Sequence, residues 1–408
     1  MDNINIVRDR FECSSCGACF SICPKNAIEI KQTAIGRKFA SANDNCINCG
    51  LCKKVCPSLD LLELSKRFQD PYVGDIKSAY VGKSLVKNIF DNAQSGGLCT
   101  TVLKYLFDKK IIDAALVTCM EEGEVPVVKS RIITTIEELY KSQKSCYTMV
   151  DVLSALQDTT KYNSIAVVGL PCHIHALEAL CKTKGSYSNV HFKLGLVCDR
   201  ILCSTIQDVM LKLADVKEGK VKIEWRRKNT TFHNVFYHYS NAPVVISSGG
   251  KIISVLSRNN RLGLKEMFTP PCCRFCVDKL ASFADIVFGD PWGISGIDLI
   301  NGESLVLTRT AKAEDLINSM ISSGYTTLNP IEVDKVILGQ KIQQKKSITD
   351  SEKRVFISEF LYNESFSKEQ IIQKAISILE KQKYVRNSLR YRITQYAKRI
   401  INKLKKIV

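Results

Sequence analysis

The chain has 408 residues, 45% of them hydrophobic, and a formal net charge of +17. This length exceeds one ordinary domain, so we expect two or three domains with at least one large core. Neither an integral membrane protein nor an exported disulfide scaffold is expected, because no apolar stretch approaches roughly twenty residues and the N-terminal residues lack a secretion signal. We therefore expect the eighteen cysteines to act in a reducing cytoplasm.

One cysteine pattern is repeated within the first sixty residues. In each copy, three cysteines are separated by two residues, and a fourth, followed by proline, comes after three more residues; the copies are Cys13, Cys16, Cys19 and Cys23, and Cys46, Cys49, Cys52 and Cys56. This spacing holds two 4Fe-4S clusters, and the fourth cysteine of each copy binds the other cluster. We therefore assign Cys56 to the first three cysteines and Cys23 to the second three. Structural zinc prefers separated pairs of ligands, and disulfides need an oxidising compartment.

The segments that follow alternate between helix and strand. A helical stretch at 59–68 leads to a Pro- and Gly-containing linker, and a second domain begins near Lys77. Periodicity predicts helices over 97–107, 136–156 and 173–180, and strands over 114–119, 164–168, 194–197, 222–225, 234–239, 244–247 and 285–288. Such alternation is typical of an α/β body.

The expected fold is α+β, with five segments. A small bacterial-type ferredoxin-like domain for two 4Fe-4S clusters is followed by a linker, a two-part α/β body and a helical basic tail. The bounds that we expect are 1–62 for the ferredoxin-like domain, 63–76 for the linker, 77–160 and 161–335 for the body, and 336–408 for the tail.

Three places in the body carry residues suited to chemistry. Ser95-Gly96-Gly97 opens the helix that carries Thr100, and such a turn lets backbone N–H groups approach an anion such as phosphate, although glycines before a helix are commonly simple punctuation. Gly169-Leu170-Pro171-Cys172 follows a buried strand, where ligands of α/β sheets bind, although Cys172 could equally be an inert buried cysteine. The third place is the run 272–278, where a Cys-x-x-Cys pair precedes a strand that ends in Gly289-Asp290.

These motifs resemble the family of coenzyme F420 hydrogenase/dehydrogenase beta subunits, a group of iron-sulfur flavoproteins. The resemblance covers about 77–331. Its points, in the family's order, are Ser95-Gly96-Gly97 with Thr100, Gly169-x-Pro171-Cys172, Cys198, Cys273-x-x-Cys276-x-Asp278 with Ala284-Asp285, and Gly289. Additional matches are Trp225-Arg226-Arg227-Lys228 and Gly302-Glu303-Ser304. Each motif is short, but their shared order is specific, and an N-terminal two-cluster ferredoxin is similar to that of several members.

The resemblance implies a third 4Fe-4S cluster, held by Cys172, Cys198, Cys273 and Cys276, close to an FAD. Cys272 and Cys203 stand near enough in sequence to substitute for individual ligands, and zinc in the same four cysteines is the alternative. The residues that the resemblance places at the FAD are Ser95, Gly96, Gly97, Thr100, Ser145, Tyr147, Gly169, Pro171, Asp278 and Gly289. Many relatives carry Ser-Lys-Tyr where this chain has Ser145-Cys146-Tyr147, so a basic side chain is missing there unless Lys144 substitutes.

The C-terminal tail supplies most of the positive charge. From Lys381 to the end there are ten Lys and Arg residues and no acidic residue. Apolar residues recur there at three- or four-residue steps, at Leu389, Ile393, Tyr396, Ile400, Leu404 and Val408. A basic amphipathic helix of this kind can lie on an anionic membrane surface, which would put the chain at the inner face of the membrane. The alternatives are a helix docked on the protein's own core or on a partner, and a solvated end; nucleic acid is the weaker candidate because no stacking-aromatic pattern accompanies the charge.

The function that we expect is an electron relay. A flavin connects two-electron hydride chemistry with the one-electron steps of iron-sulfur clusters, so electrons should pass between the three clusters, FAD and an organic substrate. No Gly-x-Gly-x-x-Gly follows a predicted strand, which favours a deazaflavin such as coenzyme F420, or another reducible small molecule, over nicotinamide. A reduced ferredoxin is a plausible protein donor. We expect a reductase or dehydrogenase complete in itself; the alternatives are an electron-transfer subunit of a larger complex and a cluster-based redox-sensing protein. No catalytic residue is assigned.

Overall fold

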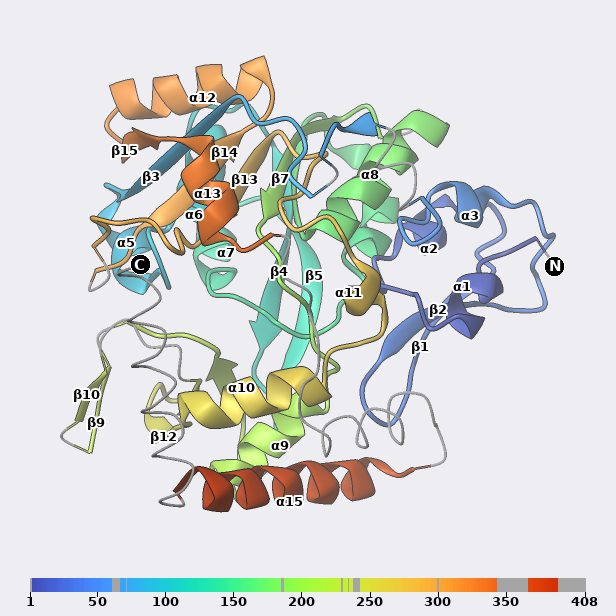
Figure 1. The fold of residues 1–408 in the computed structure, drawn as a ribbon. Coiled ribbons are helices and arrows are strands. Elements are labelled where there is room, and N and C mark those ends of the chain that lie inside the picture. Colours follow the sequence, from blue (N-terminus) through green and yellow to red (C-terminus); the bar gives the residue numbers. More distant parts are fainter. Residues whose placement is uncertain are drawn as a thin grey trace, which may run out of the picture.

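The computed structural model describes residues 2–60, 67–70, 72–184, 187–228, 230–233, 235–237, 243–298, 301–342 and 366–387. Residues 2–60 form a small module at one end of the molecule, drawn in blue in Figure 1. A two-stranded antiparallel sheet pairs Ile28 with Ala42 and Gln32 with Lys38. The elements of the module are α1 (Asn5–Asp9), α2 (Ala18–Ile22), β1 (Ile28–Gln32), β2 (Lys38–Ala42) and α3 (Leu51–Lys54).

An eight-stranded mixed sheet forms the centre of the body. Its strand order is β15-β3-β14-β13-β7-β6-β4-β5, and the four strands β13, β7, β6 and β4 run parallel to one another. The remaining neighbours pair antiparallel at the two sides. The bounds are β3 (Ser78–Ser84), β4 (Ala114–Glu121), β5 (Val127–Ile133), β6 (Ile165–Gly169), β7 (Val190–Leu196), β13 (Ile286–Gly289), β14 (Ser304–Thr308) and β15 (Thr326–Ile331).

Helices cover both faces of this sheet, as expected for an α/β layer structure. One face packs against α6 (Leu98–Asp108), α7 (Ile136–Lys141) and α12 (Ala311–Ser322) through a continuous apolar core. The other face packs against a 3-10 helix (Val152–Lys161), α8 (Pro171–Lys184) and α2 of the N-terminal module. The remaining short helices are α5 (Lys87–Asn92), α11 (Cys272–Phe275) and α13 (Val333–Gly339).

A second, smaller unit lies beyond the ends of β4 and β5, where the two strands are connected (Figure 1). Its three-stranded antiparallel sheet has the order β12-β11-β8 and shares a core with three helices. The elements are α9 (Ile206–Leu213), β8 (Val221–Glu224), β11 (Val244–Ser247), β12 (Ile252–Val255), α10 (Arg258–Met267) and α15 (Lys368–Asn387), with a separate hairpin of β9 (Thr230–Phe232) and β10 (Val235–Tyr237). Ile371, Ala375 and Ile378 of α15 are buried in that core, so this helix docks on the protein itself.

The N-terminal module is bound to the body through the turn between β1 and β2. Ile35 is buried in the core of the smaller unit. The hydroxyl of Thr205, next to α9, donates a hydrogen bond to the carbonyl oxygen of Ala34 at 2.9 Å. On a second side of the module, the hydroxyl of Ser21 in α2 donates to the carbonyl oxygen of Leu153 at 2.5 Å. The module and the body are therefore packed against each other at two places.

Most of the predicted elements are confirmed. The helix over 97–107 and the strands over 114–119, 164–168, 222–225, 244–247 and 285–288 correspond to α6, β4, β6, β8, β11 and β13. The mostly helical stretch predicted over 136–156 is confirmed only at its two ends, because α7 ends at Lys141 and a loop follows up to the 3-10 helix that begins at Val152. That loop lines the cavity described below, so its conformation depends on contacts far away in sequence.

The predicted apolar stripe of the basic tail, 389–408, lies outside the described residues, as do 61–66 of the linker region and the end of the strand predicted over 234–239. Within the described part of the chain, no helix has the length and apolar character needed to cross a membrane.

Candidate functional site

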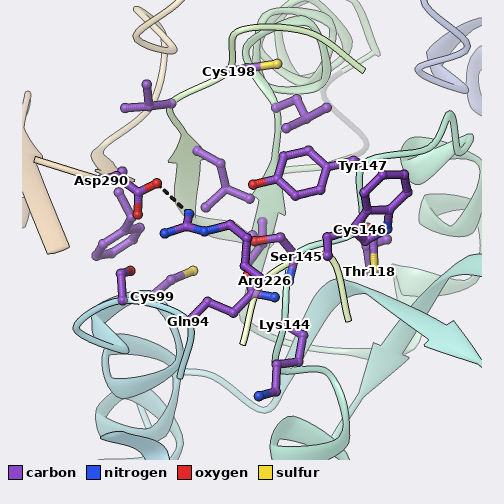
Figure 2. A pocket seen from close by; sticks show the side chains of 18 of the residues that line it. Gln94, Cys99, Thr118, Lys144, Ser145, Cys146, Tyr147, Cys198, Arg226 and Asp290 are labelled. Atoms are coloured by element: carbon purple, nitrogen blue, oxygen red, sulfur yellow. Dashed lines mark hydrogen bonds and ion pairs between the residues drawn. The ribbon is translucent and has the colours of Figure 1, made fainter. Parts of the chain in front are cut away.

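A cavity of about 330 Å³ opens at one edge of the large sheet. Its lining includes Gly169, Leu196 and Gly289, which are the last residues of the parallel strands β6, β7 and β13. Ligands of open α/β sheets bind outside the carboxyl ends of the strands, so the cavity lies where this architecture places a ligand. Figure 2 shows Cys198 at one end of the cavity and Lys144 at the other.

Seven of the ten residues predicted to bind FAD line this cavity. They are Ser95, Gly97, Thr100, Ser145, Tyr147, Gly169 and Gly289. Gly96 lies behind its neighbours, and its N–H donates to the hydroxyl of Ser304 at 3.0 Å. Pro171 and Asp278 line a different pocket, together with cysteines of the body. The sequence therefore identified residues of one cavity from four separate segments, and FAD binding by them stays a prediction.

The turn at the start of α6 is held from behind by side chains of distant segments. Gly97 begins the helix with φ +79°, a conformation that glycine adopts without strain. The hydroxyl of Ser304 lies 3.1 Å from that of Ser95. The ammonium of Lys228 donates to the carbonyl oxygens of Ser95 at 3.0 Å, Phe90 at 3.1 Å and Asn301 at 2.6 Å. The turn is thus fixed in place before any ligand reaches it.

Basic side chains line the cavity, and acidic partners compensate two of them. Lys144 lies 3.4 Å from the carboxylate of Glu224, and burial lowers the pKa of Lys144 while Glu224 opposes that change. Arg226 forms an ion pair with Asp290 at 2.5 Å inside the cavity (Figure 2). Lys144 therefore supplies a basic group directly before Ser145, whereas many relatives carry the lysine directly after the corresponding serine.

Cys172, Cys198, Cys273 and Cys276, the four cysteines assigned to a third cluster, line one pocket. Cys272 lines it too, whereas Cys203 is fully buried in the core of the smaller unit and is not among the lining residues. Burial raises the pKa of Cys172, and the charges of Cys198 and Cys276 raise it further, as expected for thiols brought close together. The fold thus gathers thiols from three distant segments, which leaves Cys272 as the remaining alternative ligand.

The cysteine pocket and the large cavity share a wall. Leu170, Cys198, Asp199, Arg200 and Ile201 line both of them. Four of these residues form the segment that follows β7, and Leu170 follows the neighbouring strand β6. A group bound by the cysteines would therefore be separated from a ligand of the cavity by the thickness of one chain segment.

The N-terminal cysteines fall into the two sets expected from the exchange of fourth ligands. A small pocket is lined by Cys23, Cys46, Cys49 and Cys52. Burial raises the pKa of Cys56, and the charges of Cys16 and Cys13 raise it further, so Cys56 lies with the first set. The N–H groups of Ser15 and Ala40 donate to the sulfur of Cys13, each at 3.4 Å, as cluster-binding sulfurs commonly accept.

The two N-terminal sets and the cysteine pocket of the body each offer the four thiols that a 4Fe-4S cluster needs around its cage. Among the described residues, no three His, Cys, Asp or Glu side chains converge closely enough to hold a single metal ion. Thiolates are the ligands that iron-sulfur clusters require, and each set provides four. The donor sets therefore suit the clusters that the spacing predicted, while the individual ligand assignments stay predictions.

The three groups of cysteines follow one another through the molecule. Burial raises the pKa of Cys19, and Cys52 of the other N-terminal set is among the charges that raise it further. Burial likewise raises the pKa of Cys172, to which Cys16 contributes across the contact between module and body. Pro57 of the N-terminal module also lines the body's cysteine pocket. Each group of cysteines therefore neighbours the next, and the last group borders the large cavity.

Comparison with known families matches almost the whole described body. Residues 12–59 match the 4Fe-4S dicluster domain, residues 79–157 the N-terminal part of the coenzyme F420 hydrogenase/dehydrogenase beta subunit, and residues 162–334 its C terminus. The chain belongs to this family of beta subunits. The resemblance inferred from the cysteines and glycine turns is confirmed, and the family's two parts are preceded here by the dicluster domain.

Three relatives come from species of Methanosarcina and Methanocaldococcus. A subunit of the F(420)H(2) dehydrogenase of Methanosarcina mazei is 27% identical, over 76% of this chain and 88% of the relative. The coenzyme F420 hydrogenase subunit beta of Methanosarcina barkeri is 23% identical, over 72% of this chain and 98% of the relative. The coenzyme F420-dependent sulfite reductase of Methanocaldococcus jannaschii is 26% identical, over 81% of this chain and 49% of the relative.

A solved structure shares the fold of the family. One chain of the F420-reducing [NiFe] hydrogenase complex of Methanosarcina barkeri aligns with a TM-score of 0.52 and 19% identity, over 78% of this chain and 95% of that chain. This likeness supports the α/β architecture of the body and its topology.

Several residues of the cavity were missed by sequence reasoning. The side-chain oxygen of Gln94 accepts from the N–H of Ser145 at 3.1 Å, which joins two predicted segments. Asp290 follows directly after Gly289 and was visible in the motif, but nothing local indicated its pairing with Arg226. Arg200 and Lys265 also line the cavity. Arg200 had a local signal, because Asp199-Arg200 follows Cys198 where relatives commonly carry other residues, whereas nothing local indicated Lys265.

Proposed function

We propose that the chain is the flavin- and cluster-containing electron-transfer subunit of a larger redox complex, and that it exchanges hydride with a deazaflavin such as coenzyme F420. The observation that carries this proposal is the shared wall: Cys198 lines both the cysteine pocket and the large cavity. FAD in the cavity would exchange hydride with an organic substrate and single electrons with a cluster in the cysteine pocket. The two reactions need neighbouring sites, and these two pockets are neighbours.

The chain's own residues suit the binding of an extended anionic cofactor. The first N–H groups of α6, preceded by Gly97, favour a phosphate, and Lys144 and Arg226 add positive charge within the same cavity. Tyr147 packs edge-on against Trp225, with ring centroids 5.5 Å apart, and gives the cavity an aromatic wall. An aromatic wall with a few placed polar groups is typical of cofactor sites.

Two observations favour a subunit over an enzyme complete in itself. Two of the relatives above are named as subunits of F420-dependent dehydrogenase or hydrogenase, which changes our sequence-based preference for a reductase complete in itself. Cys49 of the outermost cysteine set is exposed, and the neighbouring Ile47 is 58% exposed. An external electron carrier could therefore reach the end of the relay that is farthest from the cavity.

The proposal is tested by anaerobic purification, a cofactor count and a hydride-donor assay. We expect about twelve iron atoms and one FAD per chain, as three cubanes and one flavin require. Reduced coenzyme F420 should then reduce the flavin and bleach the clusters, whereas NADH should not. An iron content near eight with no flavin would contradict the proposal. Rapid reduction by NADH alone would show that the hydride donor is a nicotinamide and not a deazaflavin.

A second assay distinguishes an electron-transfer subunit and a reductase complete in itself. The purified chain should pass electrons from reduced coenzyme F420 to an artificial dye but turn over no organic acceptor unless its partner polypeptide is added. Turnover of a small organic acceptor by the isolated chain would favour the complete reductase. A redox-sensing protein would show neither reaction.

A further inference from the structure

The wall between the two pockets contains a buried arginine. The side chain of Arg200 is 8% exposed, and Arg200 lines the large cavity and the cysteine pocket at once. Asp199, the only acidic residue that shares this position among the described residues, is its neighbour in the chain. A charge in this place acts on both pockets, because the protein interior screens it far less than water does.

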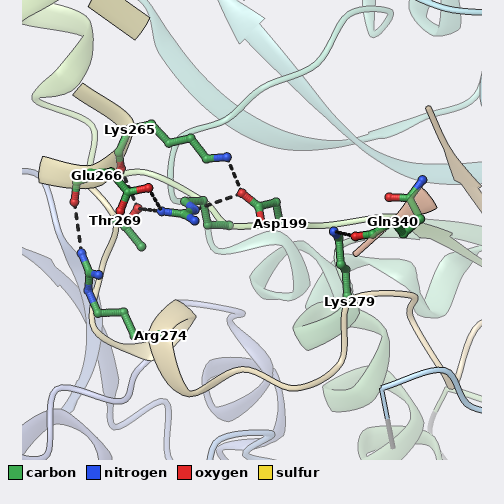
Figure 3. Close-up of polar contacts among 8 residues, drawn as sticks. Asp199, Lys265, Glu266, Thr269, Arg274, Lys279 and Gln340 are labelled. Atoms are coloured by element: carbon green, nitrogen blue, oxygen red, sulfur yellow. Dashed lines mark hydrogen bonds and ion pairs between the residues drawn. The ribbon is translucent and has the colours of Figure 1, made fainter. Parts of the chain in front are cut away.

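Contacts from α10 and the following turn fix the position of this arginine. Its Nη1 lies 2.8 Å from the carboxylate of Glu266 and donates to the hydroxyl of Thr269 at 3.3 Å. Its Nε lies 3.0 Å from the carboxylate of Asp199, which also pairs with Lys265. Figure 3 shows these partners around the segment that carries Asp199. The guanidinium is thus held by three acceptors and cannot swing out to solvent without breaking them.

From this geometry we propose that Arg200 is a positioning residue whose charge raises the reduction potentials of the groups on both sides of the wall. The inference rests on the proposed function, because it requires a cluster in the cysteine pocket and a flavin in the cavity. Reduction of a cluster adds one electron and hence one negative charge to it. A fixed positive charge nearby stabilises the reduced form, and since Arg does not lose its proton, the effect is independent of pH.

The placement of Arg200 also shifts the two potentials in the same direction. The same cation faces both sites, so it stabilises the reduced form of the cluster and the reduced form of the flavin alike. A single substitution in the wall should therefore change both potentials.

The test is a potentiometric titration of the anaerobic, cofactor-loaded full chain. Arg200→Gln removes the charge and keeps a hydrogen-bond donor. We expect the equilibrium constant for one-electron reduction of the body cluster to fall about tenfold, which lowers its reduction potential by about 59 mV. The flavin potential should move in the same direction. The outermost N-terminal cluster, which lies on the far side of the module, should keep its potential and serves as an internal reference.

Three further variants separate the effect of a lost charge from the effect of an altered structure. Arg200→Lys keeps the positive charge and should restore most of the wild-type potentials. Glu266→Gln removes an opposing negative charge and should raise the potentials, the opposite sign to Arg200→Gln. Lys217→Gln, at an exposed side chain that pairs with Asp215 and lines neither pocket, removes the same formal charge and should change nothing.

The results test the role of Arg200 separately from the proposed function. Unchanged potentials in an Arg200→Gln chain that retains its iron and FAD would overturn the inference. Should that variant lose its cofactors, Glu266→Gln decides, and the absence of an upward shift there overturns it as well. A wild-type chain without flavin or body cluster would instead remove the proposed function, and the two failures are therefore distinguishable.

Discussion

The carbonyl oxygen of Gly36 accepts a hydrogen bond from the backbone N–H of Ser204 at 3.1 Å. Gly36 lies in the turn between β1 and β2 of the N-terminal module, and Ser204 precedes α9 of the body. Together with the buried Ile35, this contact fixes the distance between the N-terminal cysteines and the cysteine pocket. A relay of clusters depends on such fixed distances, so the docking of the turn is a functional contact as well as a structural one.

Gly36 should not tolerate a side chain. A Cβ at Gly36 would come within 2.6 Å of the backbone nitrogens of Ser204 and Thr205, and its φ of +81° is a strained conformation for alanine. We expect Gly36→Ala to lower the free energy of unfolding by about 3 kcal/mol and to slow electron transfer from the module to the body. Thermal unfolding and rapid-mixing reduction measure the two effects.

Gly219→Ala is the matched control for that substitution. Gly219 also has a positive φ, +96°, but nothing lies within 4 Å of the position of its Cβ. Gly219→Ala should lower the free energy of unfolding only by the backbone strain, about 1 kcal/mol, and leave electron transfer unchanged. Equal effects of the two substitutions would show that the contact with Ser204 contributes nothing.

The exchange of fourth ligands between the N-terminal clusters can be tested by paired substitutions. Cys56→Ala should disturb the cluster of Cys13, Cys16 and Cys19, and Cys23→Ala the cluster of the other set, since Cys23 shares a pocket with it. Electron paramagnetic resonance of the reduced protein distinguishes the two signals. If each substitution disturbed the cluster of its own sequence repeat, the exchanged assignment would be wrong.

The body cluster and the flavin should be lost together. Cys273 and Cys276 line the pocket whose wall is shared with the cavity, so Cys273→Ala should remove about four iron atoms and the FAD while leaving the N-terminal clusters in place. Iron analysis and flavin release after denaturation measure both. Cys203→Ala is the control: this cysteine is buried in the core outside the pocket, so its loss should cost stability but neither cofactor.

Local patterns predicted the parts of the site whose chemistry is itself local. Three ligands of each N-terminal cluster lie within seven residues, so spacing alone indicated them. The strand Ala114–Glu121 was found because its first four residues form a continuous apolar run that is buried on both faces. The glycine turns at Ser95 and Gly169 were found because a turn before a helix has a short signature.

Contacts between distant segments could not be predicted in the same way. The strand Ser78–Ser84 was missed because its neighbours, β14 and β15, come more than two hundred residues later. The loop from Ser142 to Asp151 was read as helix, because its part in the cavity wall is set by segments around it. Lys228 belongs to a run that resembles the family, but nothing local indicated its contact with the turn at Ser95. The roles of Lys228 and Arg200 follow only from the carbonyls and carboxylates that surround them.

The contact between Lys228 and the turn at Ser95 predicts a dependence of flavin affinity on pH. Burial, together with the nearby charge of Lys144, lowers the pKa of Lys228 to about 8. The protonated ammonium has three N–H groups for three carbonyl acceptors, whereas the neutral amine has two. FAD should therefore bind less tightly as the pH rises through about 8, because one support of the turn is lost.

The free energy of unfolding should change with pH in the opposite direction to the FAD affinity, because of the same lysine. The unfolded chain keeps the proton on Lys228 up to a pH of about 10.5, and the folded chain loses it near 8, so the unfolded chain binds more protons between these values. The contribution of Lys228 to the free energy of unfolding should rise with pH in that window. Lys228→Arg, which stays protonated, should remove both trends while it keeps the charge behind the turn. The measurements are FAD titrations and urea unfolding at pH 7 and 9, and an FAD affinity of the wild-type chain that does not change between them would refute the role assigned to Lys228.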